Sequence, residues 1–249
     1  MTTLKRYSPQ LYLSEQVLPD FDVRGAVIVS PDHALVWDTL SHPDAMKKVA
    51  AVCRARTVTV VYSHADWDHV WGTAALDYRE IVAHSRCAER FAAPDDVAAT
   101  LKKRQTHDAH YTDVVLVPPT RTFANALTLE LGDLNVELHS LPGHTHDCIV
   151  AFVPALGLLL AGDTVETPLP VVPEHPALEP WLAKLGAWAR DPRVTTVVPS
   201  HGPVGGRELI EQTIFYLETL QTGEAALPEN LSPFYRQTHQ SNREHVKRP

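Results

Sequence analysis

Residues 57–71 read TVTVVYSHADWDHVW, an apolar run that passes directly into a cluster of acids and histidines. The β-branched stretch at its start is typical of a strand that is buried on both faces. Four potential metal ligands follow within six positions, namely His64, Asp66, Asp68 and His69. Side chains at the end of a rigid strand keep a fixed geometry, so this stretch predicts a metal site at a strand end.

Patterns for strands and helices alternate on both sides of this stretch, which favours the α/β class. We expect a hairpin at 25–40 and further strands at 80–84, 113–119, 121–131, 134–143, 148–162 and 194–202. We expect helices at 41–55, 70–78, 85–93, 94–105 and 206–221, and one that carries Leu178, Leu182 and Leu185. Two blocks of strands flanked by helices predict two packed sheets with helices outside. Residues 222–249 are expected to form an irregular tail of a single domain, 1–249.

Three later fragments also place a histidine or an acid directly after an apolar run. They are LPGHTHD (141–147) with His144, LLLAGDT (158–164) with Asp163, and VVPSHG (197–202) with His201. Strand ends are where open α/β folds usually place their sites. Four such fragments in one chain are difficult to assign to chance.

Taken together, SHADWDH, PGHT, GDT and SHG resemble the motifs of the metallo-β-lactamase superfamily, and they occur in the same order over residues 20–220. The resemblance implies a four-layer αββα sandwich and a hydrolase with two divalent metal ions. Carried over residue by residue, it implies a first metal held by His64, Asp66, His144 and Asp163. It implies a second metal held by Asp68, His69, Asp163 and His201, so that Asp163 would bridge the two.

Two such ions lower the pKa of a shared water from ~16 toward ~7 and so provide a hydroxide at neutral pH. In the superfamily, the acid at the position of Asp68 can also face the nucleophile, so the resemblance implies a catalytic role for Asp68. The expected substrate is a small ester, thioester, lactone or phosphodiester.

Asp66 departs from the superfamily motif, which usually has a second histidine here. Three carboxylates, two divalent ions and one hydroxide sum to a formal charge of zero, whereas two carboxylates would leave +1. A more anionic site favours iron or manganese more than an imidazole site does. Zinc is the first expectation, and iron or manganese is the alternative. The flavodiiron branch usually has Glu at this position, so the alternative function is a diiron protein that reacts with or senses oxygen or nitric oxide. A third reading is a defective site on a scaffold.

The ligand order is similar to that of glyoxalase II, whose members hold glutathione with a basic C-terminal patch, and NREHVKRP (242–249) could serve this purpose. The presence of His69 and a polar N-terminus argue against an antibiotic-degrading role. Asp38 matches an acid that orients a ligand histidine in the superfamily. Trp67 is a candidate pocket wall, whereas Trp71 is expected in the core.

Two further segments have open roles in the sequence. His146 could line the site, although packing or exposure to solvent is the simpler reading. Residues 105–113, with His107, His110 and Tyr111, could form either a lid or a plain surface loop.

Composition restricts the partners and the compartment. The formal net charge of −8 argues against binding to nucleic acid or to an anionic membrane. Cys53, Cys87 and Cys148 form no CxxC pair, which fits buried thiols in a reducing compartment. No apolar run approaches 18 residues, so a cytoplasmic enzyme that acts on small molecules is expected. The oligomeric state is not determined by the sequence.

Overall fold

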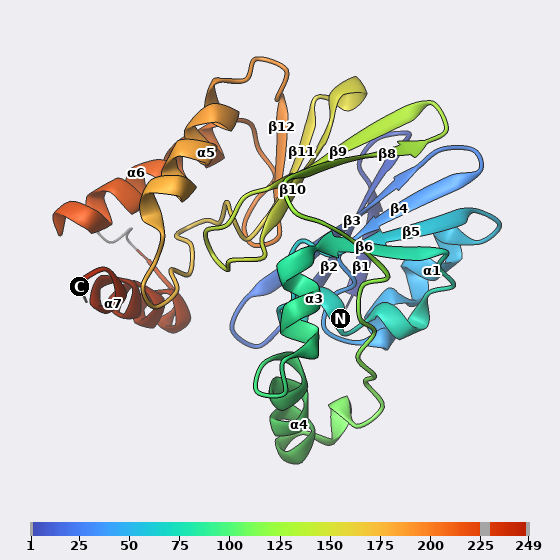
Figure 1. Ribbon diagram of the computed structural model, residues 1–249, viewed down its shortest axis with the longest axis horizontal. Coiled ribbons are helices and arrows are strands. Elements are labelled where there is room, and N and C mark those ends of the chain that lie inside the picture. Colours follow the sequence, from blue (N-terminus) through green and yellow to red (C-terminus); the bar gives the residue numbers. More distant parts are fainter. Residues whose placement is uncertain (1, 225–229, 248–249) are drawn as a thin grey trace.

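The computed structural model describes residues 2–224 and 230–247, and within these ranges two β-sheets lie between helical layers (Figure 1). The first sheet has the order β1-β2-β3-β4-β5-β6-β7. Its strands are β1 (Thr2–Arg6), β2 (Leu11–Val17), β3 (Asp22–Val29), β4 (His33–Trp37), β5 (Thr57–Val61), β6 (Glu80–His84) and β7 (Arg121–Phe123). Strands β4 to β7 run parallel to one another, and β1 to β4 pair antiparallel.

The second sheet has the order β12-β11-β10-β9-β8 in the described residues. Its strands are β8 (Ala126–Leu131), β9 (Leu134–Ser140), β10 (Ile149–Val153), β11 (Leu158–Gly162) and β12 (Thr196–Pro199). The α-helices are α1 (Lys47–Cys53), α2 (Trp67–Val70), α3 (Ser85–Ala92), α4 (Val97–His107), α5 (Leu178–Arg190), α6 (Glu208–Thr222) and α7 (Pro233–Lys247). Short 3-10 helices lie at Pro43–Met46, Thr73–Ala75, Ala109–Tyr111 and Pro154–Leu156.

Apolar side chains fill each space between the layers. Ile28 and Val61 of the first sheet share a buried cluster with Leu138 and Leu160 of the second. A second cluster joins the other face of the first sheet to α1, α3 and α4, and a third joins the second sheet to α5 and α6. Each sheet therefore buries both faces, and the expected αββα sandwich is confirmed.

The apolar run TVTVV (57–61) forms β5, which pairs with β4 and β6 inside the first sheet. Val58, Val60 and Val61 are almost fully buried. Such a strand is covered on both faces, which explains why its sequence lacks alternation. Residues that follow β5 are consequently held by a rigid core.

Several expected elements are confirmed, among them the hairpin of β3 and β4 and the strands β6 and β8 to β12. The strand expected at 113–119 is wrong, since those residues form no strand. Val114 is buried there against the helical side of the first sheet, so its apolar character reflects packing alone. The helix expected at 70–78 is also mostly wrong, because α2 ends at Val70 and only Thr73–Ala75 form a 3-10 turn.

The irregular tail expected at 222–249 is wrong for the part that the structure describes, because residues 233–247 form the amphipathic helix α7. Asn242 on this helix is buried and binds the backbone at Pro170 and Val172. Tertiary contacts thus stabilise a segment whose polar sequence gives little sign of a helix. Residues 225–229 and 248–249 lie outside the described residues, and the assignment of a single domain stays a prediction.

Candidate metal centre

Asp163 lies at the centre of the site, directly after strand β11. Its carboxylate oxygens lie 3.2 Å from Nε2 of His201 and 3.4 Å from Nε2 of His69. The same group lies 3.7 Å from Nε2 of His144 and 3.8 Å from Nε2 of His64. Four imidazoles therefore surround one carboxylate, as a bridging ligand between two metal ions would require.

The backbone before Asp163 requires glycine. Gly162 has a φ of 55° and follows a register irregularity between β11 and β12. A side chain here would be strained and would approach Cβ of Ser63 to 3.0 Å. Gly162 thus lets the turn that carries Asp163 lie against the turn that carries His64.

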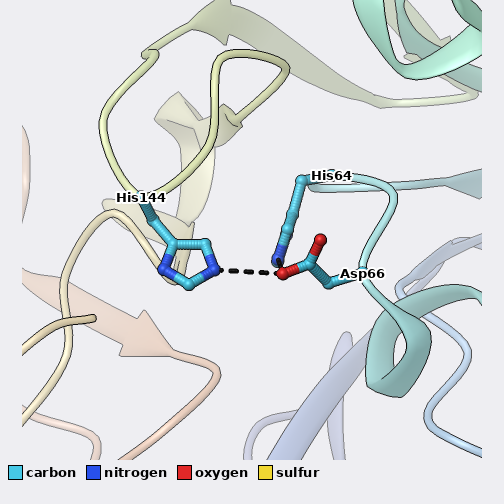
Figure 2. Close-up of side chains that lie close together, drawn as sticks. All are labelled: His64, Asp66 and His144. Carbon is cyan, nitrogen blue, oxygen red and sulfur yellow. Dashed lines mark hydrogen bonds and ion pairs between the residues drawn. The ribbon is translucent and has the colours of Figure 1, made fainter. Parts of the chain in front are cut away.

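His64, Asp66 and His144 form one side of the site, which we call the His144 half. Figure 2 shows the two imidazoles pointing at the Asp66 carboxylate from separate loops. Oδ2 of Asp66 lies 3.2 Å from Nε2 of His144 and 3.5 Å from Nε2 of His64. Asp66 precedes helix α2, whereas His144 lies in the loop between β9 and β10. These three donors lie close enough together to surround one cation.

Asp68, His69 and His201 form the other side, which we call the His201 half. Oδ1 of Asp68 lies 3.7 Å from Nε2 of His69, and Oδ2 lies 3.7 Å from Nε2 of His201. Asp68 and His69 lie on α2, and His201 follows strand β12. All three are buried, and they form a second group of suitable donors.

The residues present fit a metal centre. Three buried atoms, Nε2 of His64, Nε2 of His69 and Oδ1 of Asp163, lack a hydrogen-bond partner among the described residues. An unpaired polar atom in the interior is costly, so three of them gathered at one place indicate a bound ligand. All three face the same space, and imidazole and carboxylate are the donors that zinc and iron use. The fit supports metal binding, while the ligand assignment itself stays a prediction.

The ring nitrogens that point away from this space are also held. Nδ1 of His69 lies 2.9 Å from Oδ2 of Asp38, and the Ser63 hydroxyl donates to the same carboxylate oxygen. The Ser63 oxygen lies 2.9 Å from Nδ1 of His64. Nδ1 of His144 lies 3.2 Å from the Val171 carbonyl oxygen. Such partners fix the ring so that Nε2 faces the metal.

Asp38 therefore occupies the place expected for an acid that orients a ligand histidine. It is fully buried, and its amino-acid type tolerates the left-handed φ of 59° found there. The backbone amide of Ser63 also donates to its carboxylate at 2.7 Å. His201 is held differently, because its Nδ1 lies 2.7 Å from the backbone oxygen of Asp22.

Opposite charges dominate the electrostatics of the site. Burial lowers the pKa of His144 and His201, but the nearby carboxylates raise these values to about 9 and about 10. Burial raises the pKa of Asp163, yet the charges of His69 and His201 hold it well below its usual range. Metal binding would have to displace the imidazole protons, which couples affinity to pH.

Asp66 has a counterion that sequence reasoning did not identify. Nη2 of Arg90 on helix α3 donates to Oδ1 of Asp66 at 2.8 Å. The same guanidinium donates to Asp147 at 3.0 Å and to Asp96 at 2.9 Å. Asp147 is fully buried, and it also accepts the backbone amide of Ala65 at 2.8 Å. The oxygen of Asp66 that faces the histidines is thus aimed by a network behind it.

A cavity of about 240 Å³ opens over the two halves. Its lining residues are Phe21, Asp66, Trp67, Asp68, His144, Asp163, Glu166, Val171, His201 and Phe234. Trp67 thus forms part of the wall, as predicted. Sequence reasoning did not single out Phe21, Glu166 and Phe234. Phe21 and Phe234 are far from the ligand motifs in the chain, and Glu166, although only three residues after Asp163, belongs to no motif.

Comparisons with known proteins identify the family of the chain. The pattern of the metallo-beta-lactamase superfamily matches residues 20–201, which is more than half of the chain. The chain belongs to the metallo-β-lactamase superfamily. The match confirms the family resemblance found in the four motifs and supports a metal-dependent hydrolase.

Two individual proteins with similar sequences share only about a quarter of their residues with this chain. The chain is 25% identical to a metallo-beta-lactamase type 2 from Bacillus cereus over 200 residues, which are 78% of this chain and 70% of the relative. A metallo-beta-lactamase type 2 from Bacillus sp. (strain 170) is 27% identical over 201 residues, which are 78% of this chain and 69% of that one.

Solved structures show the same fold. A metallo-beta-lactamase from Pontibacter korlensis superimposes with a TM-score of 0.67 and 18% identity, covering 88% of this chain and 99% of that one. The mono-zinc form of the metallo-beta-lactamase FIM-1 from Pseudomonas aeruginosa gives 0.64 and 18%, covering 88% of this chain and 95% of that one. At this identity, the likeness establishes the superfamily fold alone.

The other residues that the sequence singled out lie in the core or at the surface, outside the site. Trp71 is fully buried in the core, as expected, and His146 is exposed to solvent. His107 and His110 are exposed and Tyr111 is buried against Trp71, so none of the three lines the cavity. Cys53, Cys87 and Cys148 are free and buried. In the described part of the chain, no helix is long and apolar enough to span a membrane.

Proposed function

We propose that the chain is a hydrolase with two metal ions, acting on a small ester, thioester, lactone or phosphodiester. The observation that carries this proposal is the clustering of seven donor residues around Asp163, five of which line the cavity. They are His64, Asp66, Asp68, His69, His144, Asp163 and His201. Asp163, which lies near all four imidazoles, would be shared between the two halves.

Divalent ions bound here would supply a Lewis acid and a water of lowered pKa. The chain's own residues would then orient the reaction. Asp68 lines the cavity and is 5% exposed, so it can accept a proton from the attacking water as a catalytic base. Trp67 and Phe21 form an apolar wall that would exclude bulk water from one side of the substrate.

Four imidazoles among the seven donors support zinc as the metal, with iron or manganese as the alternative. Asp66 adds a negative charge relative to the usual histidine, and Arg90 lies 2.8 Å from it. The same guanidinium also pairs with Asp96 and Asp147, so it offsets only part of that charge. The argument for iron from a more anionic site is therefore reduced but not removed, and the diiron function stays the alternative.

Metal content measured by mass spectrometry tests the proposal first. Protein purified without chelator or added metal should contain about two zinc ions per chain. Mostly iron would favour the diiron function instead, and reactivity with oxygen or nitric oxide would be measured next. Protein that contains no metal and takes up none would support the scaffold reading and contradict the proposal.

A panel of small esters, thioesters, lactones and phosphodiesters would then locate the substrate. The cavity of about 240 Å³ is below the usual size for drug-sized ligands, which supports a small substrate. β-Lactams belong in the panel as a second candidate, because two relatives are named metallo-beta-lactamases. Cleavage of a β-lactam faster than any ester would favour this second candidate.

We also propose a cytoplasmic location and no nucleic-acid partner. The three free, buried cysteines support a reducing compartment. The net charge of −8 supports the absence of a polyanionic partner.

A further inference from the structure

Glu166 is a buried acid in the cavity that the proposed chemistry does not use. It lies on the chain segment after Asp163, and 3% of its surface is exposed. Its Oε1 accepts the hydroxyl of Tyr235 at 3.0 Å, and its Oε2 accepts the backbone amide of Val171 at 3.3 Å. Burial raises its pKa to about 7. A buried acid with only neutral donors is costly, so its retention calls for an explanation.

The side chains that line the cavity carry more negative than positive charge. Four of the lining residues are carboxylates, and none of the described lining residues is lysine or arginine. Asp66 is paired with Arg90, and Asp68 and Asp163 face the imidazoles. His144 and His201 also act on Glu166 electrostatically, but these imidazoles already face Asp66 and Asp163. Two divalent ions and a hydroxide would balance the other three carboxylates, so Glu166 would add a surplus negative charge to the loaded centre. An anionic substrate group placed beside it would meet repulsion, whereas a cationic group would be attracted.

An aromatic wall borders the same cavity. The ring of Phe21 lies 6.4 Å from the ring of Trp67 and 5.1 Å from the ring of Phe234, measured between centroids. The three rings come from the loop before β3, from α2 and from α7. Aromatic faces attract cations, and groups of such rings bind quaternary ammonium ions in other proteins. Wall and carboxylate together match a ligand group that is both apolar and positively charged.

We propose that Glu166 and the wall of Phe21, Trp67 and Phe234 form a subsite for an alkylammonium group of the substrate. This inference rests on the proposed hydrolytic function and narrows its substrate class to cationic esters or thioesters. The scissile carbonyl would lie over the metal ligands, and the ammonium group beside Glu166. The contact with Tyr235 would hold the carboxylate in place rather than neutralise it.

The test uses three thioacetates of similar length and the zinc-loaded full chain. Their thiol parts are 2-(trimethylammonio)ethanethiol, its neutral isostere 3,3-dimethylbutanethiol, and 2-sulfoethanethiol, and the released thiol is measured. We expect kcat/KM to fall in this order, by about tenfold or more between the cationic and the anionic substrate. Equal values for the three substrates would overturn the subsite.

Substitutions separate charge from support. Glu166→Gln removes the charge but keeps an oxygen that can accept the Val171 amide, while its NH2 group can donate to the Tyr235 oxygen. It should lower the ratio of kcat/KM for the cationic to the neutral substrate about tenfold, and Glu166→Lys should reverse the preference. Glu211→Gln, at an exposed site on α6, removes the same charge elsewhere and should leave the ratio unchanged. A ratio that stays at its original value in Glu166→Gln would overturn the subsite.

A purely structural role for Glu166 predicts another pattern. Tyr235→Phe and Glu166→Gln would then lower kcat/KM equally for all three substrates. Binding without turnover gives a second measurement, by calorimetry with benzyltrimethylammonium and benzenesulfonate. We expect only the cation to bind, about tenfold more weakly in Glu166→Gln. Selective binding without hydrolysis of any thioacetate, ester, lactone or phosphodiester would keep the subsite and contradict the hydrolase. Hydrolysis without selectivity would do the opposite.

Discussion

The two halves of the metal centre are held in different ways. In the His144 half, a charged network supports the carboxylate of Asp66, whose side chain is 29% exposed. Arg90 stands behind it and connects it to Asp96 and Asp147. In the His201 half, the supporting residue is one acid, Asp38, which contacts Nδ1 of His69. Both side chains are fully buried.

The difference indicates what a carboxylate would need in order to serve as a ligand at the place of an imidazole. An imidazole needs only a partner for its second ring nitrogen, as Asp38 provides for His69. A carboxylate needs a counter-charge as well, and Arg90 supplies it for Asp66. The departure from the usual histidine is therefore accompanied by a built ion pair, which argues against neutral drift at a single position.

Removing the shared residue should have the largest effect. Asp163→Ala takes away the carboxylate that lies near all four imidazoles, so both halves should lose metal. We expect metal content to fall from about two ions per chain to near zero. Asp133→Ala, in an exposed turn, is the matched control. Unchanged metal content in Asp163→Ala would show that the ligand assignment is wrong.

Removing the counter-charge should affect one half. Arg90→Met leaves Asp66 and the buried Asp147 without a cation, which should cost about 3–5 kcal/mol of the free energy of unfolding. Metal content should fall from about two ions to about one, with the loss in the His144 half. Arg86→Met, one turn earlier on the exposed face of α3, is the control. Arg90→Lys retains the positive charge and therefore shows whether the loss of metal follows from the loss of charge or from misfolding. If Arg90→Met still held two metal ions, Arg90 would not be needed to support the His144 half.

Weakening the buried support should affect the other half less severely. Asp38→Asn removes the charge that faces Nδ1 of His69 but keeps an acceptor for the Ser63 amide. The affinity of the His201 half for zinc should fall about 10- to 100-fold, measured by competition with a chromophoric chelator. Asp32→Asn, at an exposed turn, should leave the affinity unchanged. The Ser63 hydroxyl joins Asp38 to His64, so a smaller loss of affinity is also expected in the His144 half. An equal loss in both halves would contradict the comparison.

Replacing Asp66 by the histidine that the superfamily usually has should change metal content and activity least. It is the most direct test of whether Arg90 serves Asp66. Asp66→His should keep zinc and hydrolysis, because Arg90 still pairs with Asp96 and Asp147. In the Arg90→Met background the same change removes an unpaired acid, so it should recover part of the lost zinc affinity. Additive effects of the two substitutions would show that Asp66 and Arg90 are not coupled. Loss of both zinc and activity in the single variant would mean that the acid itself is required.

Much of the fold and all seven residues brought together in the site could be predicted, because their signals are local. Val58 and Val60 lie in a run that reads as a buried strand, and His64 follows it within a few positions. Asp163 and His201 have the same local signal. Order along the chain then allowed the comparison with a known family.

The supporting residues could not be predicted, because their partners are distant in sequence. Arg90 reads as an ordinary charge on a helix, and only the fold places it beside Asp66 and Asp147. Glu166 carries no motif of its own. The strand expected at 113–119 is absent for a different reason. Pro118 and Pro119 have no backbone N–H to donate to a neighbouring strand, and the apolar residues before them pack against the core without forming a strand.

Helix α7 completes the cavity, and this has a consequence for the order of assembly during synthesis. Its Phe234 lines the cavity, its Tyr235 binds Glu166, and its Asn242 holds the loop at Pro170. Ribosomes make the chain from the N-terminus, so all seven proposed ligands are synthesised before any residue of α7. All the proposed metal donors would therefore be present before α7 is made, whereas the part of the cavity wall that Phe234 provides comes last.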